Sequence, residues 1–105
     1  MSTLVASVRP FQAGSLFMSS SVFSATCEHV PFGQFVRSCV ERHLSGDWGD
    51  CCRDDASRND AAVLDGSRLF SVYLIPSGLF ALESKIWIIT ESGREYTTVI
   101  FPSDY

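Results

Sequence analysis

The sequence predicts one small α+β domain, with two helices packed on a mostly antiparallel sheet of three to five strands. Apolar residues between Pro31 and Leu44 recur at spacings of three and four, which is typical of a helix that buries one face. After Gly66 the apolar period switches to two, which indicates strands. The 105 residues suit a single domain, and their composition, 46% apolar and 19% charged, is that of a folded chain.

The first 29 residues carry a weak pattern, which we interpret as one or two short strands. Leu4, Ala6 and Val8 alternate with polar residues, Leu16 to Met18 form a short apolar run, and three serines interrupt the pattern after it. We expect residues 1–13 to be loosely ordered or to form an edge strand of the single domain.

The strongest local prediction is a helix from Pro31 to Leu44. Proline fits the first turn, and Gly46 can adopt the left-handed conformation that ends a helix. Its predicted core stripe comprises Phe32, Phe35, Val36, Cys39, Val40, His43 and Leu44.

A second helix is expected to run to about Leu64, with Gly66 ending it. Asp54 or Asp55 is expected to accept a hydrogen bond from the free amides at its start, and further acids there complement the helix dipole.

Three strands should follow the second helix. Ser92-Gly93-Arg94 is a tight turn in which glycine supplies a positive φ, so the last two strands form a hairpin. An irregular loop is expected from Pro76 to Glu83. The expected strands span residues 68 to 75, 85 to 91 and 95 to 101.

Acidic residues are concentrated in one third of the chain. The formal charge is −4. The segment from Asp47 to Asp65 contains six aspartates and only two arginines, so we expect a negative surface there. Direct binding to nucleic acid is disfavoured, because phosphate contacts need clustered basic residues and Lys85 is the only lysine. A basic protein partner fits this charge better, although an acidic stretch is also typical of a merely solvated helix face.

Membrane and secretory roles are disfavoured. The longest nearly uncharged run, Pro10 to Cys27, contains Gln12, Gly14 and several serines, so it does not suit a membrane-spanning helix. The N-terminus lacks the uninterrupted apolar block of a secretory signal. We therefore expect a cytoplasmic protein, a monomer or weak homodimer, whose four cysteines are free thiols rather than two disulfides.

The side chains that could form a catalytic or metal site are His43, Asp47, Cys51 and Cys52, which lie within ten residues. Zinc sites pair ligands in two separate clusters, and no second cluster exists here. The surrounding carboxylates disfavour a reactive thiolate. We therefore expect a His43 that interacts with the dipole at its helix end, with no metal, cofactor or catalytic residue. A small metal- or thiol-dependent hydrolase using this cluster remains the alternative hypothesis.

Trp48 lies in a loop between two Gly/Asp pairs, where glycine permits backbone angles closed to other residues. It is either a buried anchor for the loop or an exposed binding hot spot, and we favour the anchor. Trp87, on an expected strand, should pack on a face of the sheet. The candidate binding residues are Asp47, Trp48, Asp50, Asp54, Asp55 and Asp60.

Two sequence blocks carry a resemblance to a known family. They are Gly46-Asp47-Trp48-Gly49-Asp50 and Lys85-Ile86-Trp87-Ile88-Ile89-Thr90-Glu91, accompanied by Asp55, Asn59, Gly66-Ser67-Arg68-Leu69, Thr97-Thr98 and Phe101-Pro102-Ser103-Asp104-Tyr105. From about Gly14 to Tyr105 the chain resembles short bacterial proteins of plasmids and integrative elements, often described as plasmid-related or restriction-associated.

The resemblance implies a mobile-element protein that binds and inhibits a host defence system, in the manner of anti-CRISPR or anti-restriction proteins. Such a module would occupy the basic nucleic-acid-binding surface of a defence effector.

Overall fold

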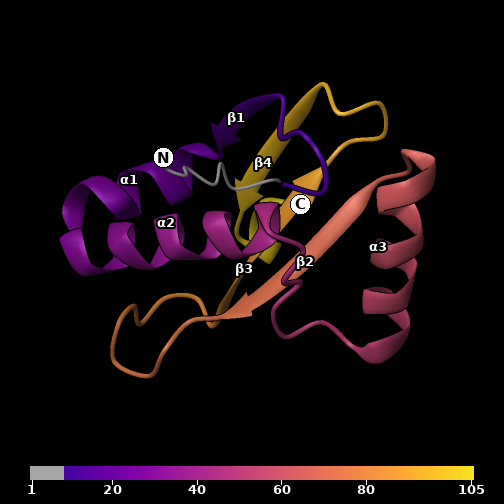
Figure 1. Ribbon diagram of the computed structural model, residues 1–105. Helices are drawn as coiled ribbons and strands as arrows, with labels where there is room; N and C mark the ends of the chain where they lie inside the picture. The colour runs from indigo at the N-terminus through magenta and orange to yellow at the C-terminus, as the bar shows by residue number, and fades with distance from the viewer. Residues whose placement is uncertain (1–8) are drawn as a thin grey trace, which may run out of the picture.

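The computed structural model describes residues 9–105, which form three α-helices, one four-stranded sheet and a short C-terminal 3₁₀ turn (Figure 1). The elements follow the order β1 (Ser15–Met18), α1 (Ser20–Glu28), α2 (Val30–Leu44), α3 (Arg53–Asp65), β2 (Leu69–Leu74), β3 (Lys85–Thr90), β4 (Tyr96–Ile100) and η1 (Pro102–Asp104). The α+β class is confirmed.

The sheet has the strand order β1-β4-β3-β2. β2 pairs antiparallel with β3 and β3 antiparallel with β4, whereas β1 lies parallel to β4. The expected mostly antiparallel sheet is therefore confirmed, as is the hairpin. Its turn contains two residues with positive φ, Gly93 and Arg94.

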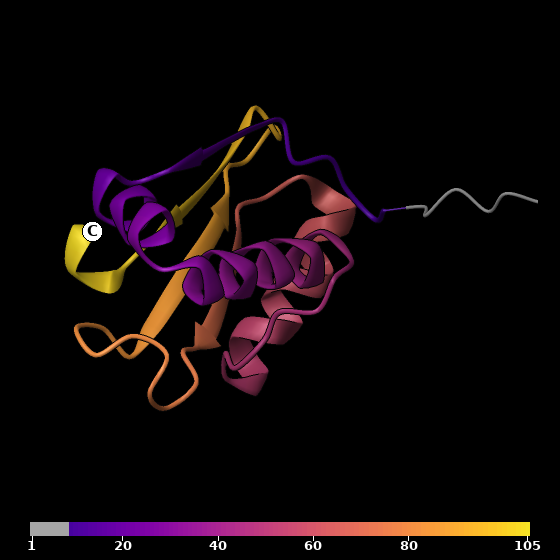
Figure 2. The same cartoon turned by 90° about the vertical axis from the view of Figure 1, so that its left-hand side faces the viewer.

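Alternation along the strands gives the sheet one buried face and a second, more exposed face, which we call the open face. Ile89 and Ile100 on the open face are also buried. On the buried face the strands contribute their most enclosed side chains, among them Leu69, Tyr73, Ile86, Ile88 and Val99. α2 lies on this side, and the C-terminal turn lies on the other side of the strands (Figure 2). The stripe predicted for α2 faces the core, with Phe32, Val36, Cys39, Val40, His43 and Leu44 buried.

The two predicted helices are confirmed as α2 and α3. Pro31 occupies the first turn of α2, and Gly66 ends α3 with a left-handed φ of 81°. The predicted cap of α3 is wrong. The residue at its N-cap is Cys52, which makes no side-chain capping bond, while Asp54 and Asp55 lie inside the first turn. There their charges complement the helix dipole without capping it.

The N-terminal third contains a helix that the sequence pattern did not predict. β1 confirms one expected strand, but the serines after it, expected only to interrupt the strand pattern, begin α1. The Ser19 hydroxyl accepts the Val22 N–H, and both Ser19 and Ser21 donate to the Asp104 carboxylate. The predicted alternation at Leu4, Ala6 and Val8 lies outside the described residues. Residues 9–14 form no strand, and Phe11 is buried in the core.

Candidate protein-binding surface

The segment Trp48-Gly49-Asp50 closes the outer edge of β2. It forms a parallel bridge in which Val72 donates its N–H to the Trp48 carbonyl at 3.3 Å and accepts the Asp50 N–H at 2.6 Å. The Asp50 carboxylate then accepts the Leu74 N–H at 2.9 Å. This short segment therefore satisfies edge groups that would otherwise be free to pair with another chain.

Asn59 extends the same closure from α3. Its amide oxygen accepts the Phe70 N–H at 3.0 Å, and its amide nitrogen donates to the Phe70 carbonyl at 2.7 Å. One buried side chain thus replaces both main-chain partners of a strand residue. The sequence offered little signal for this role, because an asparagine within a polar helix looks like an ordinary solvent-facing residue.

Gly49 permits the close approach that this bridge requires. Its φ is +72°, and a β-carbon at this position would overlap the Val72 carbonyl oxygen and the Tyr73 ring. Both the backbone angle and the available space therefore demand glycine.

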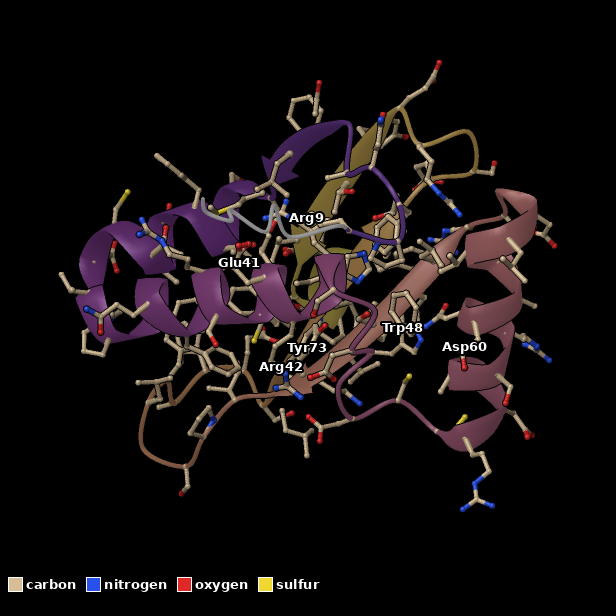
Figure 3. The ribbon with its side chains drawn as sticks, viewed as in Figure 1. Arg9, Glu41, Arg42, Trp48, Asp60 and Tyr73 are labelled. Carbon is tan, nitrogen blue, oxygen red and sulfur yellow. The ribbon has the colours of Figure 1, made fainter. Side chains whose placement is uncertain are left out.

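Trp48 is the anchor that joins this loop to the core and to α3. Its side chain is buried, stacks on Phe11 with ring centroids 6.0 Å apart, and meets His43 edge to face. Its indole N–H donates to the Asp60 carboxylate at 2.9 Å. Asp60 lies on α3, on the side of that helix toward Trp48 (Figure 3). The anchor interpretation is confirmed, and the buried Trp48 side chain is not part of the exposed surface. We call Trp48, Gly49, Asp50, Asn59 and Asp60 the β2 brace.

His43 is fully buried and belongs to a network of hydrogen-bonded polar side chains. Its Nδ1 is 2.6 Å from the Ser71 hydroxyl and its Nε2 2.9 Å from the Thr90 hydroxyl, which in turn contacts the Thr97 hydroxyl at 2.7 Å. Burial, assisted by the charge of Arg94, lowers the pKa of His43 to about 4. The expected interaction of a charged His43 with the helix dipole is therefore wrong: the ring is neutral at pH 7.

The partners of His43 were missed from the sequence. Ser71 and Thr90 occupy inward positions of strands that were recognised only by their apolar alternation. A small polar residue at an inward position of a strand is the signal that could have located this buried chain.

Two residues of the alternative hydrolase site, His43 and Asp47, are bonded to other groups. Both ring nitrogens of His43 form hydrogen bonds with strand hydroxyls, and the Asp47 carboxylate forms an ion pair with Arg42 at 2.8 Å. All four cysteines are free thiols, but burial, followed by the charge of Asp55, raises the pKa of Cys51. Within residues 9–105, no group of three His, Cys, Asp or Glu side chains is placed to hold a metal ion.

The segment that carries the acidic residues includes α3, which lies beside β2 at the edge of the sheet (Figure 1). Asp47 anchors its own turn by accepting the Gly49 N–H, and the hydrogen bond from Arg42 lowers its pKa. Asp54 is exposed on α3, and Asp55 makes only a long contact of 3.7 Å with the exposed Arg58. We call Asp47, Asp50, Asp54, Asp55 and Asp60 the acidic face.

This charge is confined to a single segment of the chain. Residues 47–65 hold six aspartates and two arginines, while the rest of the chain holds six acids and six bases. The segment therefore carries the entire formal charge of −4. The β2 brace fixes part of this charge in place, because Asp50 and Asp60 are bonded to β2 and Trp48.

The open face of the sheet is lined by aromatic rings. Trp87 packs edge to face on Phe70 and on Tyr105, at centroid distances of 5.2 and 5.7 Å. Its expected packing on a sheet face is therefore confirmed. The Arg68 guanidinium lies over the Tyr105 ring at 5.8 Å.

The chain matches no known family model, no curated protein and no solved structure. None of the helices in the described part of the chain is long and apolar enough to span a membrane.

Proposed function

We propose that this protein is a non-enzymatic binding module that presents its acidic face to a basic protein surface. The observation that carries the proposal is the confinement of the whole net charge to residues 47–65, beside an otherwise balanced molecule. A charge concentrated on one rigid side steers association with an oppositely charged partner and orients it on encounter.

The positions of the acids support this interpretation. Asp54 and Asp55 project from the first turn of α3, at the margin of a surface that the β2 brace holds rigid. A preorganised surface loses little conformational entropy on binding. The alternative hydrolase has no comparable support, because its proposed base His43 and carboxylate Asp47 are each bonded to other groups.

The finer proposal names the partner as a nucleic-acid-binding effector of a host defence system. The mobile-element origin expected from the two sequence blocks motivates it, and the acidic face supplies a mechanism, competition with nucleic acid for a basic channel.

Co-expression with a CRISPR effector complex and with a restriction complex tests the proposed acidic binding face and the proposed class of partner together. We expect stoichiometric co-purification with one of them, and restored plating of a phage that the complex otherwise restricts. Asp54→Lys with Asp55→Lys should weaken both effects. Asp60 is unsuitable for charge reversal because it accepts the Trp48 indole N–H.

The matched control is Glu28→Lys with Glu95→Lys, which changes the net charge equally at exposed positions outside the acidic face. Thermal melts of each variant separate a binding loss from the modest cost of removing acids at a helix N-terminus, about 0.3 to 1 kcal/mol each. Equal loss in both double variants would contradict the acidic-face mechanism. No capture by either complex would contradict a role against these defence systems.

A further inference from the structure

The two edges of the sheet differ in how their main-chain groups are satisfied. The β2 edge is closed by the β2 brace, whereas no segment within residues 9–105 pairs with the outer edge of β1. Edge strands in soluble proteins are usually blocked by charged residues, proline or a covering segment. β1 carries none of these, and residues 10–27 around it contain no charged residue.

The backbone of β1 presents a regular set of outward groups. Ser15, at the start of β1, donates its N–H to the carbonyl of Glu95, just before β4. Ser19, just after β1, donates its N–H to the Val99 carbonyl of β4. Because alternate residues of a strand direct their main-chain groups to opposite sides, those of Leu16 and Met18 point away from the sheet. The intervening side chain, Phe17, is 55% exposed and meets Tyr96 edge to face.

An open groove lies beside this edge, on the helix side of the sheet. Its volume between β1 and α2 is about 1090 Å³, and its apolar lining includes Leu16, Met18, Val36 and Val40. Charged side chains, those of Arg9, Arg37 and Glu41, also line it. The Leu16 and Met18 side chains remain 47% and 39% exposed there. A strand added to β1 would direct its own alternate apolar side chains into this groove.

We propose that the outer edge of β1 binds β1 of a second copy of this chain, antiparallel, to form a two-fold symmetric dimer with a continuous eight-stranded sheet. With Phe17 opposite Phe17 of the second copy, Leu16 and Met18 face Met18 and Leu16 of that copy. Each such pair exchanges two N–H to carbonyl bonds, so four hydrogen bonds form. The interface is isologous, as a two-fold axis requires.

The charge distribution favours a second copy as the occupant. Two chains that each carry −4 repel one another, but here the charge lies beside β2, at the opposite edge of the sheet from β1. Antiparallel docking through β1 joins the two edges that lie away from the acidic faces. It keeps those faces far apart, where salt screens them. It also leaves both acidic faces free, so the dimer does not depend on the proposed function.

A four-residue strand makes a small interface, so the dimer should be weak and concentration-dependent. Sedimentation equilibrium of the full chain from micromolar to near-millimolar concentration should show a reversible monomer–dimer equilibrium. Phe17→Lys places two like charges opposite each other at the two-fold axis and should raise the dimer Kd at least about tenfold.

Mixing Phe17→Lys with Phe17→Glu should restore dimerisation, which a merely misfolded variant would not do. Leu64→Lys on α3 is the matched control, because it also replaces an exposed apolar residue with lysine but lies away from β1. It should leave the Kd unchanged. A chain that stays monomeric throughout, or a Phe17 pair that fails to restore association, would overturn the proposal.

Hydrogen exchange of the Leu16 and Met18 amides identifies the occupant directly. A second copy protects them only at high protein concentration. Protection at every concentration would show that the chain's own residues cover the edge, and absence of protection at every concentration would show that the edge stays unpaired. Either of these two results would overturn the proposal.

Discussion

Lowering the pH from 6.5 to 4 should destabilise this protein through His43. The ring is fully buried, and burial lowers its pKa from 6.5 to about 4. In this window the unfolded chain takes up a proton at His43 while the folded chain does not, so the free energy of unfolding falls as the pH falls. A difference of about 2.5 pKa units corresponds to roughly 3 kcal/mol, fully present above pH 6.5 and lost by pH 4.

Urea denaturation at a series of pH values measures this loss. The slope should approach about 1.4 kcal/mol per pH unit between the two pKa values. Asp47, whose pKa the hydrogen bond from Arg42 lowers, loses its contribution only at more acidic pH, near and below about 4. His43→Gln should remove the slope, whereas His29→Gln, at an exposed position, should retain it.

A direct NMR titration of the His43 imidazole keeps the test independent of whether the glutamine variant folds. If the His43 ring titrates near 6.5 in the folded protein, or if the wild-type free energy of unfolding is flat between pH 6.5 and 4.5, the reasoning about the buried ring is wrong.

Three substitutions test the packing of the core and the β2 brace, each by urea denaturation. Trp48→Ala should lower the free energy of unfolding by about 3 to 5 kcal/mol, because it removes a buried ring. A loss below about 1 kcal/mol would place Trp48 at the surface. Asn59→Ala should cost about 1 to 3 kcal/mol, since both Phe70 main-chain groups lose their partner. An unchanged midpoint would show that water replaces the amide. Val36→Asp should unfold the domain by burying an unpaired charge, and a near-normal melt would mean that this face of α2 is not core.

The sequence predicted the elements whose signals are local and periodic. The stripe from Phe32 to Leu44 specified α2, and Gly46 and Gly66 located two helix ends because each has a positive φ. The strands after Gly66 were located to within one or two residues by their alternation.

Features that depend on distant residues were not predictable in this way. α1 buries only Val22 and Ala25, and Asp104 supports its start from more than 80 residues away. Asp50, Asn59 and Asp60 looked like surface polar residues, yet they close a sheet edge or hold Trp48. Hydrogen bonds between residues that are distant in the sequence decide these roles, and a local sequence pattern contains no information about such bonds.

The association rate with the captured effector, measured by stopped-flow at low and high salt, tests the acidic face most directly. At about 50 mM salt, Asp54→Lys with Asp55→Lys should slow association strongly, and the Glu28→Lys and Glu95→Lys control should slow it far less. At about 500 mM salt the two double variants should converge, because screening removes the steering. Equal rates for both variants at low salt would contradict the proposal that this face binds the partner.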